Sequence, residues 1–244
     1  MSRGIYVALS GAVAQEQALE TTATNLANAA TAGYQRSRAT FREVLAQART
    51  GGRGELLHYT AVGQTAIDGT RGAVRSTGRG LDVALAEGEF LAVTTPRGER
   101  YTRAGSLVMG SDGTLRMSGG GAPLAREDGE PIRLAPAGGE PTIGADGTIF
   151  QANEAVGKLK IVGLGQGTSL VHEGGGLLSA RGAMATVGAP EIEVGALEDS
   201  NAAPVTSMTE LVTASRTFEV FQRMLETFGE CDRKVLTTTA SPTE

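Results

Sequence analysis

The stretch Ala23-Thr-Asn-Leu-Ala-Asn-Ala-Ala-Thr-Ala-Gly-Tyr-Gln-Arg-Ser-Arg-Ala-Thr-Phe41 organises the rest of the chain around it. It joins the end of an expected N-terminal helix to a polar, basic segment. Gly33 stands at the turn, because glycine adopts a left-handed conformation without steric cost. The stretch contains no pattern typical of catalysis. We therefore expect its role to depend on how it pairs with residues 204–236, near the other end of the chain.

Residues 3–32 are predicted to form one helix that ends before Gly33. Apolar side chains recur there in steps of four and three, which is typical of the a and d positions of a coiled coil. An amphipathic helix on a globular core has the same spacing, so that interpretation stays open. The positions of the repeat are Ile5, Leu9, Ala12, Glu16, Leu19, Ala23 and Leu26.

A second helix is predicted near the C-terminus. Pro204 suits the first turn of a helix, and Ser207 to Glu210 has the spacing of a capping box, so the helix can begin at either place. The last residues, 237–244, are small and polar and are expected to fray. Steps of three and four again place one side chain per turn on a common face, at Leu211, Ala214, Phe218, Phe221, Leu225, Phe228, Asp232 and Val235.

The middle of the chain is predicted to be mostly β. It holds most of the 35 glycines, and short apolar runs alternate with turn signals. Asp-Gly pairs favour tight hairpins because both residues tolerate positive φ; they begin at Asp68, Asp112, Asp128 and Asp146. The expected strands are Leu81 to Leu85, Phe90 to Thr94, Leu107 to Met109, Leu115 to Met117, Thr148 to Phe150 and Leu159 to Val162.

The expected fold is α+β, with N- and C-terminal helices pairing as a coiled-coil-like layer and a mostly antiparallel, glycine-rich β domain between them. A lone helix hairpin leaves much apolar surface exposed to water, so full ordering is expected against neighbouring copies, in a ring or filament. The predicted segments are an N-terminal helix (1–34), a connector (35–69), a β domain (70–197), a C-terminal helix (198–236) and a tail (237–244).

Composition excludes several classes of function. The net charge of −5 gives no general case for nucleic-acid binding. Cys231 is the only cysteine, which excludes an intramolecular disulfide, and His58 and His172 lie far apart without the spacing of a zinc site. No apolar run approaches the length of about 18 residues that suggests a membrane span. We expect no catalytic residues, metal or cofactor.

The N-terminus imitates a short signal peptide, with Arg3 before an apolar run from Ile5 to Ala14. Ser10 and Gly11 interrupt this run, and the heptad repeat continues past the apparent cleavage site. We therefore expect the segment to be retained, with cleavage after Ala14 as the alternative.

The segment from Arg36 to Arg53 is basic, with five arginines and Glu43 as its one acid. It is interpreted either as a solvated connector or as a surface for an anionic partner or an acidic subunit face. The stretch Gly51-Gly52-Arg53-Gly54 is predicted to be a break in the chain and a flexible joint.

Several separated motifs resemble those of flagellar basal-body rod and hook proteins. An Asn-Leu-Ala-Asn run followed by Gly-Tyr, a Leu-Asp pair, a Tyr-Thr-Arg-x-Gly segment and a Ser-Asn pair occur in the order typical of that family. The resemblance spans nearly the whole chain and rests on Asn25, Leu26, Ala27, Asn28, Gly33, Tyr34, Phe41, Leu81, Asp82, Tyr101, Thr102, Arg103, Gly105, Ser200 and Asn201.

The chain departs from the family pattern at Thr24, where asparagine is usual, and at Gly80, where proline is common. Val156 to Val162 resembles the proximal-rod branch, and the short segment between Phe41 and Thr77 also favours it. The distal rod subunit is the close alternative.

The resemblance implies a structural subunit that is exported by the flagellar type III apparatus without a cleaved signal. Such subunits polymerise with copies of themselves and with neighbouring rod proteins, and they transmit torque across the periplasm. Their terminal helices form the inner tube and the β domain forms the outer layer. The implied subunit-interface residues are Ile5, Leu9, Ala12, Leu19, Ala23, Leu26, Leu211, Ala214, Phe218, Phe221, Leu225 and Phe228.

Two further classes remain open at this stage. A secreted β-rich binding protein with an oligomerising helical stalk has the same composition and repeats. An enzyme acting on the cell wall is the other class, although no paired carboxylates, nucleophile or metal ligands support it.

Overall fold

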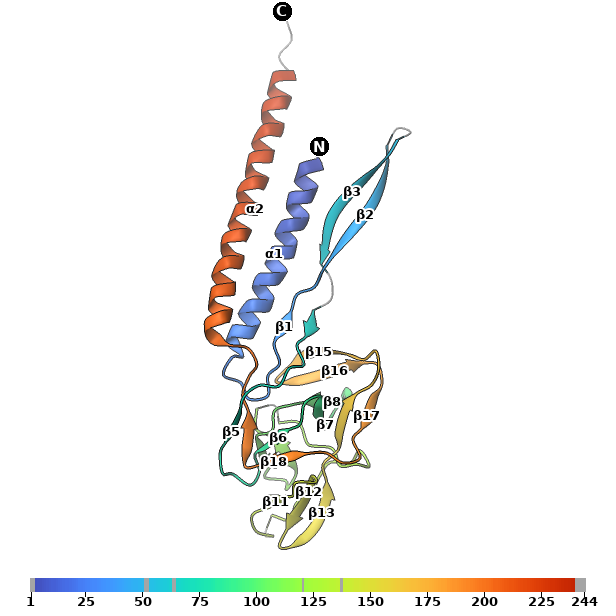
Figure 1. Cartoon of the computed structure of the whole chain (residues 1–244), viewed down its shortest axis with the longest axis vertical. Helices are drawn as coiled ribbons and strands as arrows, with labels where there is room; N and C mark the ends of the chain where they lie inside the picture. The colour runs from blue at the N-terminus through green and yellow to red at the C-terminus, as the bar shows by residue number, and fades with distance from the viewer. Residues whose placement is uncertain (1–2, 51–52, 63–64, 120, 137, 240–244) are drawn as a thin grey trace, which may run out of the picture. The chain divides into compact units, whose positions relative to one another are not determined.

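The computed structural model describes residues 3–50, 53–62, 65–119, 121–136 and 138–239. In this part of the chain, helices α1 (Arg3–Ala27) and α2 (Pro204–Thr239) enclose a long β region (Figure 1). Every strand pair whose register is given is antiparallel. The expected α+β class, with terminal helices and a mostly antiparallel β region between them, is confirmed.

The chain divides into two compact units, which are described separately. The helical unit contains Met1–Leu26, Ser37–Thr65 and Pro204–Glu244, and the β unit contains Ala27–Arg36 and Ala66–Ala203. Among the described residues, no helix is long and apolar enough to span a membrane.

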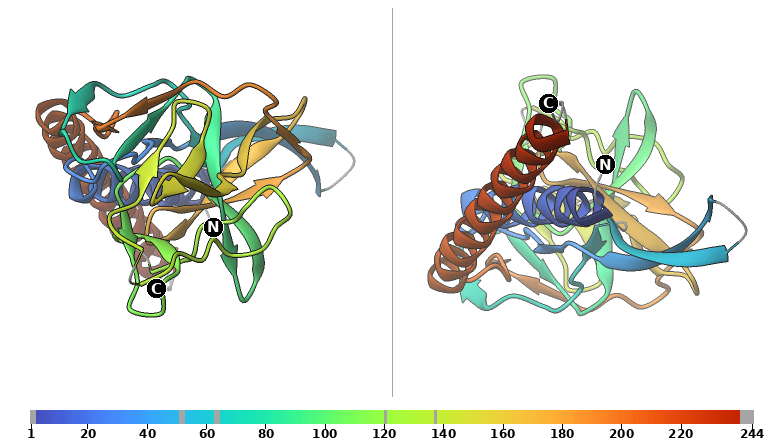
Figure 2. Two further views of the ribbon diagram at one scale, coloured as in Figure 1. Left: turned by 90° about the horizontal axis from the view of Figure 1, so that it is seen from below. Right: turned by 90° about the horizontal axis from the view of Figure 1, so that it is seen from above.

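In the helical unit, α1 and α2 lie side by side and run antiparallel (Figures 1 and 2). Helix α2 begins at Pro204, which is one of the two predicted starts, and continues to Thr239. Thr237 to Thr239 are therefore helical rather than part of a tail, and 240–244 lie outside the described residues. The start at 198 given for the C-terminal helix segment is wrong, because Glu198 ends strand β19 (Ala196–Glu198). Helix α1 ends at Ala27, so the predicted end at residue 32 is wrong. A turn follows, in which the Thr31 N–H donates to the Asn28 carbonyl oxygen over 3.0 Å.

The predicted connector contains a β-hairpin that sequence analysis missed. Strands β2 (Phe41–Thr50) and β3 (Arg53–Val62) pair along their whole length, from Phe41 opposite Val62 to Thr50 opposite Arg53. Gly51 and Gly52 fall between them, outside the described residues. Arg53 and Gly54 begin β3, so their assignment to a flexible joint is wrong. A Gly-Gly pair between two runs of β-forming residues is a hairpin signal; its interpretation as a joint overlooked the runs on each side.

The β unit is built around a six-stranded antiparallel sheet with the order β15-β16-β8-β7-β14-β17. The other strands form smaller two- and three-stranded sheets. The strands outside the hairpin are β1 (Ser37–Arg38), β4 (Ala66–Ile67), β5 (Val74–Ser76), β6 (Val83–Leu85), β7 (Glu89–Thr95), β8 (Gly98–Thr102), β9 (Leu107–Met109), β10 (Leu115–Met117), β11 (Thr142–Ile143), β12 (Thr148–Gln151), β13 (Glu154–Lys158), β14 (Ile161–Leu164), β15 (Ser169–Gly174), β16 (Leu177–Arg181), β17 (Met184–Thr186), β18 (Ile192–Val194) and β19 (Ala196–Glu198).

The core of the β unit is aliphatic. Each fully buried side chain of this kind contributes roughly 1.5–3 kcal/mol of transfer free energy. The predicted apolar runs supply most of the core, and β9 and β10 have the predicted bounds. Its main cluster of buried residues includes Val83, Leu85, Leu91, Val93, Leu107, Leu115, Met117, Leu124, Ile132, Ile149, Leu159 and Ile161.

Three of the four Asp-Gly pairs make the expected tight turns. Gly113, Gly129 and Gly147 have φ of 74°, 89° and 84°, and the first and last of them join β9 to β10 and β11 to β12. The pair at Asp68 forms no hairpin. Its carboxylate Oδ1 instead accepts hydrogen bonds from the backbone and hydroxyl of Thr70, at 3.2 and 2.9 Å.

Candidate functional site

Where the two terminal helices contact each other, phenylalanine rings of α2 pack against glycines of α1. A Cβ atom added to Gly11 would lie 2.4 Å from Cε1 of Phe221, and one added to Gly4 would lie 2.8 Å from Cζ of Phe228. Both distances are shorter than a normal carbon–carbon contact, so only glycine leaves room for the rings. The two pairs are seven residues apart on each helix, which is the spacing of a heptad.

Small side chains continue this contact toward the start of α2. The Gln15 side-chain amide donates a hydrogen bond to the carbonyl oxygen of Ala214 over 3.3 Å. Ala8 and Ala12 on α1 are buried, as is Ala214 on α2. Small residues let two helix backbones approach closely, so large rings from one side fill the space left by the other.

On α2, every described position of the predicted repeat is buried or half-buried, from Leu211 to Asp232; the side chain of Val235 is outside the description. On α1, Ile5, Ala12, Leu19 and Leu26 are at least partly buried. Three α1 positions of the repeat differ, since Leu9 is 48% exposed and Glu16 and Ala23 are exposed. The assignment of all these residues to a subunit interface stays a prediction.

Sequence analysis missed Gly4 and Gly11 because a repeat search for apolar side chains does not count glycine. The contact face of α1 is therefore rotated from the predicted apolar repeat onto its smallest residues. Two glycines spaced by seven, facing phenylalanines spaced by seven, were the available signal.

In the β unit, three distant motifs come together around Gly33. Its φ is 70°, which confirms the expected left-handed turn. The Gly33 N–H donates to the Glu198 carbonyl oxygen over 2.7 Å. A Cβ atom at this position would lie 2.3 Å from the backbone carbonyl of Arg103. Glycine is thus required both by the turn and by the close approach of Arg103.

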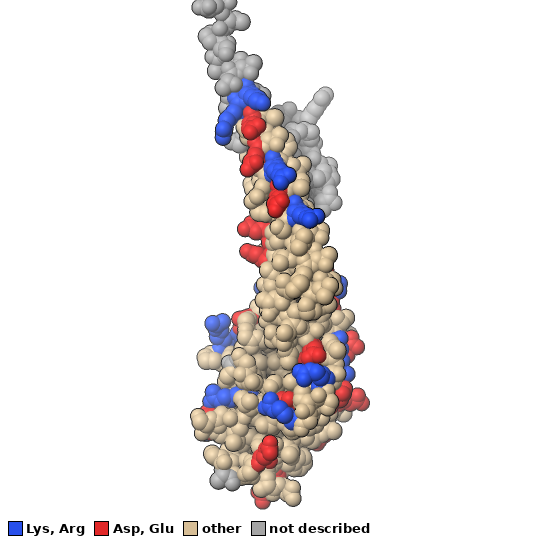
Figure 3. Space-filling view, turned by 90° about the vertical axis from the view of Figure 1, so that its left-hand side faces the viewer, with Lys and Arg blue, Asp and Glu red and all other residues tan. Residues whose placement is uncertain are grey.

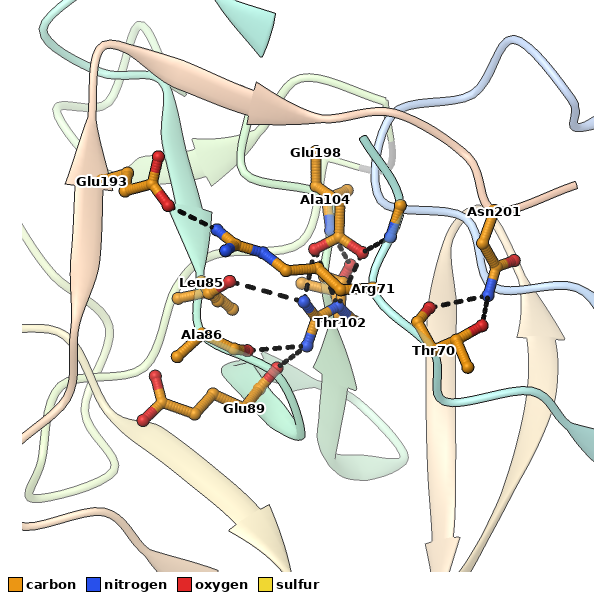
Figure 4. Close-up of polar contacts among 12 residues, drawn as sticks. Thr70, Arg71, Leu85, Ala86, Glu89, Thr102, Ala104, Glu193, Glu198 and Asn201 are labelled. Carbon is orange, nitrogen blue, oxygen red and sulfur yellow. Dashed lines mark hydrogen bonds and ion pairs between the residues drawn. The ribbon is translucent and has the colours of Figure 1, made fainter. Parts of the chain in front are cut away.

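Arg103 and Glu198 form a buried ion pair at the same place. Figure 4 labels Glu198 together with Ala86 and Glu89, whose carbonyl oxygens also bind the guanidinium. Their side chains are 0% and 2% exposed. The guanidinium Nε donates to both carboxylate oxygens, at 3.2 and 3.0 Å. Its Nη1 donates to the carbonyl oxygens of Ala86 and Glu89, at 3.1 and 2.8 Å. Glu198 Oε1 also accepts the Gly72 N–H over 3.0 Å. Such saturation is what a buried charge pair needs to be tolerated.

Asn201 joins further segments to this cluster, which we call the motif junction (Gly33, Tyr34, Arg103, Glu198 and Asn201). Its side-chain oxygen accepts the Arg36 N–H over 2.6 Å. Its amide nitrogen donates to the carbonyl oxygens of Asp68 and Thr70, at 2.9 and 2.8 Å. The Asn201 N–H donates to the Tyr34 carbonyl oxygen over 3.2 Å. One asparagine therefore holds backbone from two other stretches of the chain.

Asn25, in the helical unit, has a comparable role. Its amide nitrogen donates to the Ser37 carbonyl oxygen and its oxygen accepts the Ser37 N–H, both over 2.8 Å. Asn28 accepts the turn hydrogen bond from Thr31. Ser200 accepts the N–H of the residue two positions later over 3.1 Å. Ala27 is exposed, and Phe41 at the start of β2 is 47% exposed.

The remaining motif residues stabilise turns and close contacts of the β unit. Asp82 is buried and accepts the Thr77 hydroxyl over 2.7 Å, while the neighbouring Leu81 packs against the core. A Cβ atom at Gly105 would lie 1.7 Å from the carbonyl oxygen of Val83. Glycine is therefore required where these two segments touch.

Tyr101 and Thr102 lie side by side on β8 and make different contacts. The Thr102 hydroxyl donates to the Gly176 carbonyl oxygen over 2.8 Å and accepts the Ala104 N–H over 3.0 Å. The Tyr101 hydroxyl donates to Glu99 Oε1 over 3.1 Å. Burial, with the charge of Glu99, raises the pKa of Tyr101 to about 12.

His172 on β15 is a second contact that sequence analysis did not connect to the motifs. Its ring stacks on Tyr34, with centroids 5.0 Å apart and planes 15° from parallel. Its Nε2 lies 2.8 Å from the Gln35 carbonyl oxygen, to which it donates. Burial lowers the pKa of His172, and the hydrogen bond to Gln35 opposes that shift.

Acid is expected to weaken this contact. Because the folded-state pKa of His172 is lowered, its contribution to stability is present above the ordinary value of about 6.5 and decreases as pH falls through the folded-state pKa. Urea unfolding at pH 7 and pH 5 should therefore show a larger loss for the natural chain than for His172→Gln, which keeps an N–H donor but does not titrate. Equal losses in the two proteins would contradict this assignment.

The junction's polar side chains bond to the chain's own backbone and to each other. Among the described residues, no group of three or more His, Cys, Asp or Glu side chains is arranged to hold a metal ion. A long helix pair and a saturated buried junction are the features of a structural protein, in which polar residues fix backbone segments in place.

Comparison with known proteins identifies the family to which this structural protein is similar. Residues 5–35 match the family model "Flagella basal body rod protein", and residues 193–238 match "Flagellar basal body rod FlgEFG protein C-terminal". The flagellar basal-body rod protein FlgF of Mesorhizobium japonicum is 33% identical over 90% of each chain. FlgF of Escherichia coli is 34% identical over 94% of this chain and 95% of its own. FlgG of Bacillus subtilis is 28% identical, with 94% and 96% covered.

The chain belongs to the flagellar basal-body rod protein family. The resemblance inferred from the motifs is therefore confirmed. The first matched region contains most of α1 with Gly33 and Tyr34, and the second contains Glu198 and Asn201 with most of α2. The family signature thus covers both the helix pair and two of the three motifs that meet at the junction.

Proposed function

We propose that this chain is a structural subunit of the proximal rod, polymerising through its terminal helices to transmit torque across the periplasm. The observation that carries the proposal is that both matched family regions fall on the two helices that pack against each other. The FlgF relatives at 33 and 34% identity favour the proximal rod. In this proposal α1 and α2 form a coiled-coil-like inner layer, and the β unit forms the outer one.

The proposed mechanism is mechanical rather than catalytic. Torque passes along a polymer when many modest contacts act at once, because the chance that all of them yield together is small. The saturated junction of Arg103 and Glu198 would keep the β unit rigid under load. We infer that the chain needs no cofactor and binds no nucleic acid. Its partners would be further copies, neighbouring rod proteins and the flagellar type III export apparatus, which would export it with its first residues retained.

The distal rod is the second candidate, and a specific observation supports it. FlgG of Bacillus subtilis matches over nearly the same share of the chain as the FlgF relatives do, at 28% identity. The difference in identity is modest, so the position of the chain along the rod must be measured.

Mass spectrometry of purified hook–basal bodies tests the proposal most directly. We expect the chain to be present with residues 1–14 intact, and deletion of its gene to abolish motility. Partial disassembly from the two ends would separate a proximal from a distal position. If the chain were absent from basal bodies and found in the medium without its first residues, a stalked secreted protein would be the better interpretation.

Phe218→Asp is expected to block rod assembly and motility while leaving the β unit folded. Phe218 is half-buried on the contact face of α2, and a carboxylate there would be desolvated without a partner. Swimming on soft agar and limited proteolysis of the purified chain measure the two outcomes. Thr227→Asp is the matched control, because Thr227 is exposed and its hydroxyl bonds to the Arg223 carbonyl oxygen of its own helix. Normal swimming of Phe218→Asp would contradict the assignment.

A further inference from the structure

Helix α1 carries an apolar stripe that the helix pair leaves uncovered. Tyr6, Leu9 and Val13 are 60, 48 and 47% exposed. Their spacing of three and four places them on one face. Val13 is nine residues from Gly4, or about two and a half turns, so this face points away from α2. No charged residue occurs from Gly4 to Gln15.

Helix α2 carries a matching stripe near its start. Val205, Met208 and Val212 are 77, 54 and 53% exposed. Val212 is nine residues from Phe221, again about two and a half turns, so this stripe also points away from the helix pair. On the face that Figure 3 shows, the charged side chains gather over the C-terminal part of α2, and the surface over its first turns is uncharged. Isolated exposed apolar residues are ordinary, but a helical row of three marks a binding face.

The two stripes cannot cover each other within one copy. The contacts of Gly4 with Phe228 and of Gly11 with Phe221 place Leu9 at the level of about residue 223 of α2. Met208 is about 15 residues nearer the start of α2, which corresponds to about 22 Å along the axis. The stripes also face outward from opposite sides of the pair.

We propose that these stripes bind each other between successive copies of this chain. Tyr6, Leu9 and Val13 of one copy would lie against Val212, Met208 and Val205 of the next, respectively. The outer two pairs keep one register, since seven residues separate Tyr6 from Val13 and Val205 from Val212, and the middle pair is offset by one residue, about 1.5 Å along the axis. The inference rests on the proposed polymerisation and adds its register.

The geometry of this contact makes it head-to-tail. Each copy offers one stripe of each kind at a different level, so every added copy presents a fresh stripe to the next. Such a heterologous contact does not close on itself and generates a filament. The axial step between the two copies in contact would be about 20 Å. A second copy fits better than an unrelated partner because none of the six stripe residues is charged, so no ion within the stripes is desolvated when they meet.

A disulfide between Leu9→Cys and Met208→Cys tests the register, in a Cys231→Ser background because Cys231 is exposed. Disulfides require Cα atoms about 4.4–6.8 Å apart, so the pair cannot close within one copy. Oxidation of basal bodies carrying the variant should yield a ladder of dimers and longer products. The control pair is Glu20→Cys with Met208→Cys, since Glu20 is also exposed on α1 but lies about three turns beyond Leu9. We expect at least tenfold less product from it.

The outcomes separate this inference from the proposed function. Absence of the chain from basal bodies would overturn the proposed function itself. Incorporation and swimming without the ladder, or cross-linking to a different rod protein, would overturn only the register. If the double variant does not enter basal bodies, oxidation of the concentrated purified chain gives the same readout, and the absence of a ladder there also overturns the register.

A second experiment asks whether a stripe binds itself. Leu9→Lys removes one stripe and Met208→Lys removes the other, so each variant alone should sediment as a monomer at concentrations where the natural chain forms oligomers. An equimolar mixture should form dimers and stop there, because each variant retains one usable stripe. Dimers of either variant alone would show self-pairing and would overturn the head-to-tail contact.

Discussion

Replacing Glu198 with glutamine is expected to lower the free energy of unfolding of the β unit by about 3–5 kcal/mol. The substitution keeps the shape of the side chain but leaves the Arg103 guanidinium, which is fully buried, without a compensating charge. Urea unfolding followed by circular dichroism measures the change. A loss below about 1 kcal/mol, the range of a surface ion pair, would show that the pair is not the central contact of the junction.

Glu173→Gln is the matched control. It also removes a carboxylate from an arginine at 2.8 Å, but Arg100 and Glu173 are 16 and 25% exposed. Water compensates both groups when the pair is broken, so we expect little measurable change. The double variant Arg103→Met with Glu198→Met should recover part of the stability lost in Glu198→Gln, because no buried charge remains.

Replacing Gly11 with alanine is expected to unfold part of the helix pair and abolish motility. Alanine is the better helix former by about 1 kcal/mol, yet the new Cβ would lie 2.4 Å from the Phe221 ring. Overpacking of this kind costs about 1–3 kcal/mol. The loss should appear as a lower thermal midpoint of the helical signal, together with failure to swim.

Gly229→Ala provides the comparison on α2. A Cβ at Gly229 would meet nothing within 4 Å, so the helix propensity of alanine acts alone and the helical signal should become more stable. Phe221→Leu combined with Gly11→Ala should restore part of the loss by making room for the new methyl group. If Gly11→Ala were as stable as Gly229→Ala, the ring over Gly11 would not be a packing constraint.

Much of this fold could be predicted because local chemistry and global structure agree. Asp112 and Asp146 precede glycines that carry positive φ, so their hairpins form wherever the flanking runs are apolar. Pro204 begins α2 for a local reason as well, since proline lacks the N–H that the first turn leaves unpaired. Helix α1 ends before the predicted residue 32. There the side chain of Asn25 bonds to Ser37 and that of Asn28 to Thr31, and the spacing of apolar residues does not reveal such contacts.

The motif residues were found by their resemblance to a family, but their partners were not. Arg103 and Glu198 are almost a hundred positions apart, and no spacing rule connects them. His172 gave no signal at all, because a single histidine in a strand carries no periodicity. A buried arginine does require a carboxylate, yet the number of acidic residues in the chain leaves the choice open.

The sequence by itself determined the two terminal helices, the β region between them and the family, because each follows from short-range pattern or motif order. Tertiary structure alone decided which face of α1 meets α2, since the contact depends on the missing side chains of Gly4 and Gly11 rather than on apolar ones. It also decided the junction at Gly33, where the backbone of Arg103 approaches too closely for any Cβ. Contacts of this kind depend on the space between segments, which only the assembled fold defines.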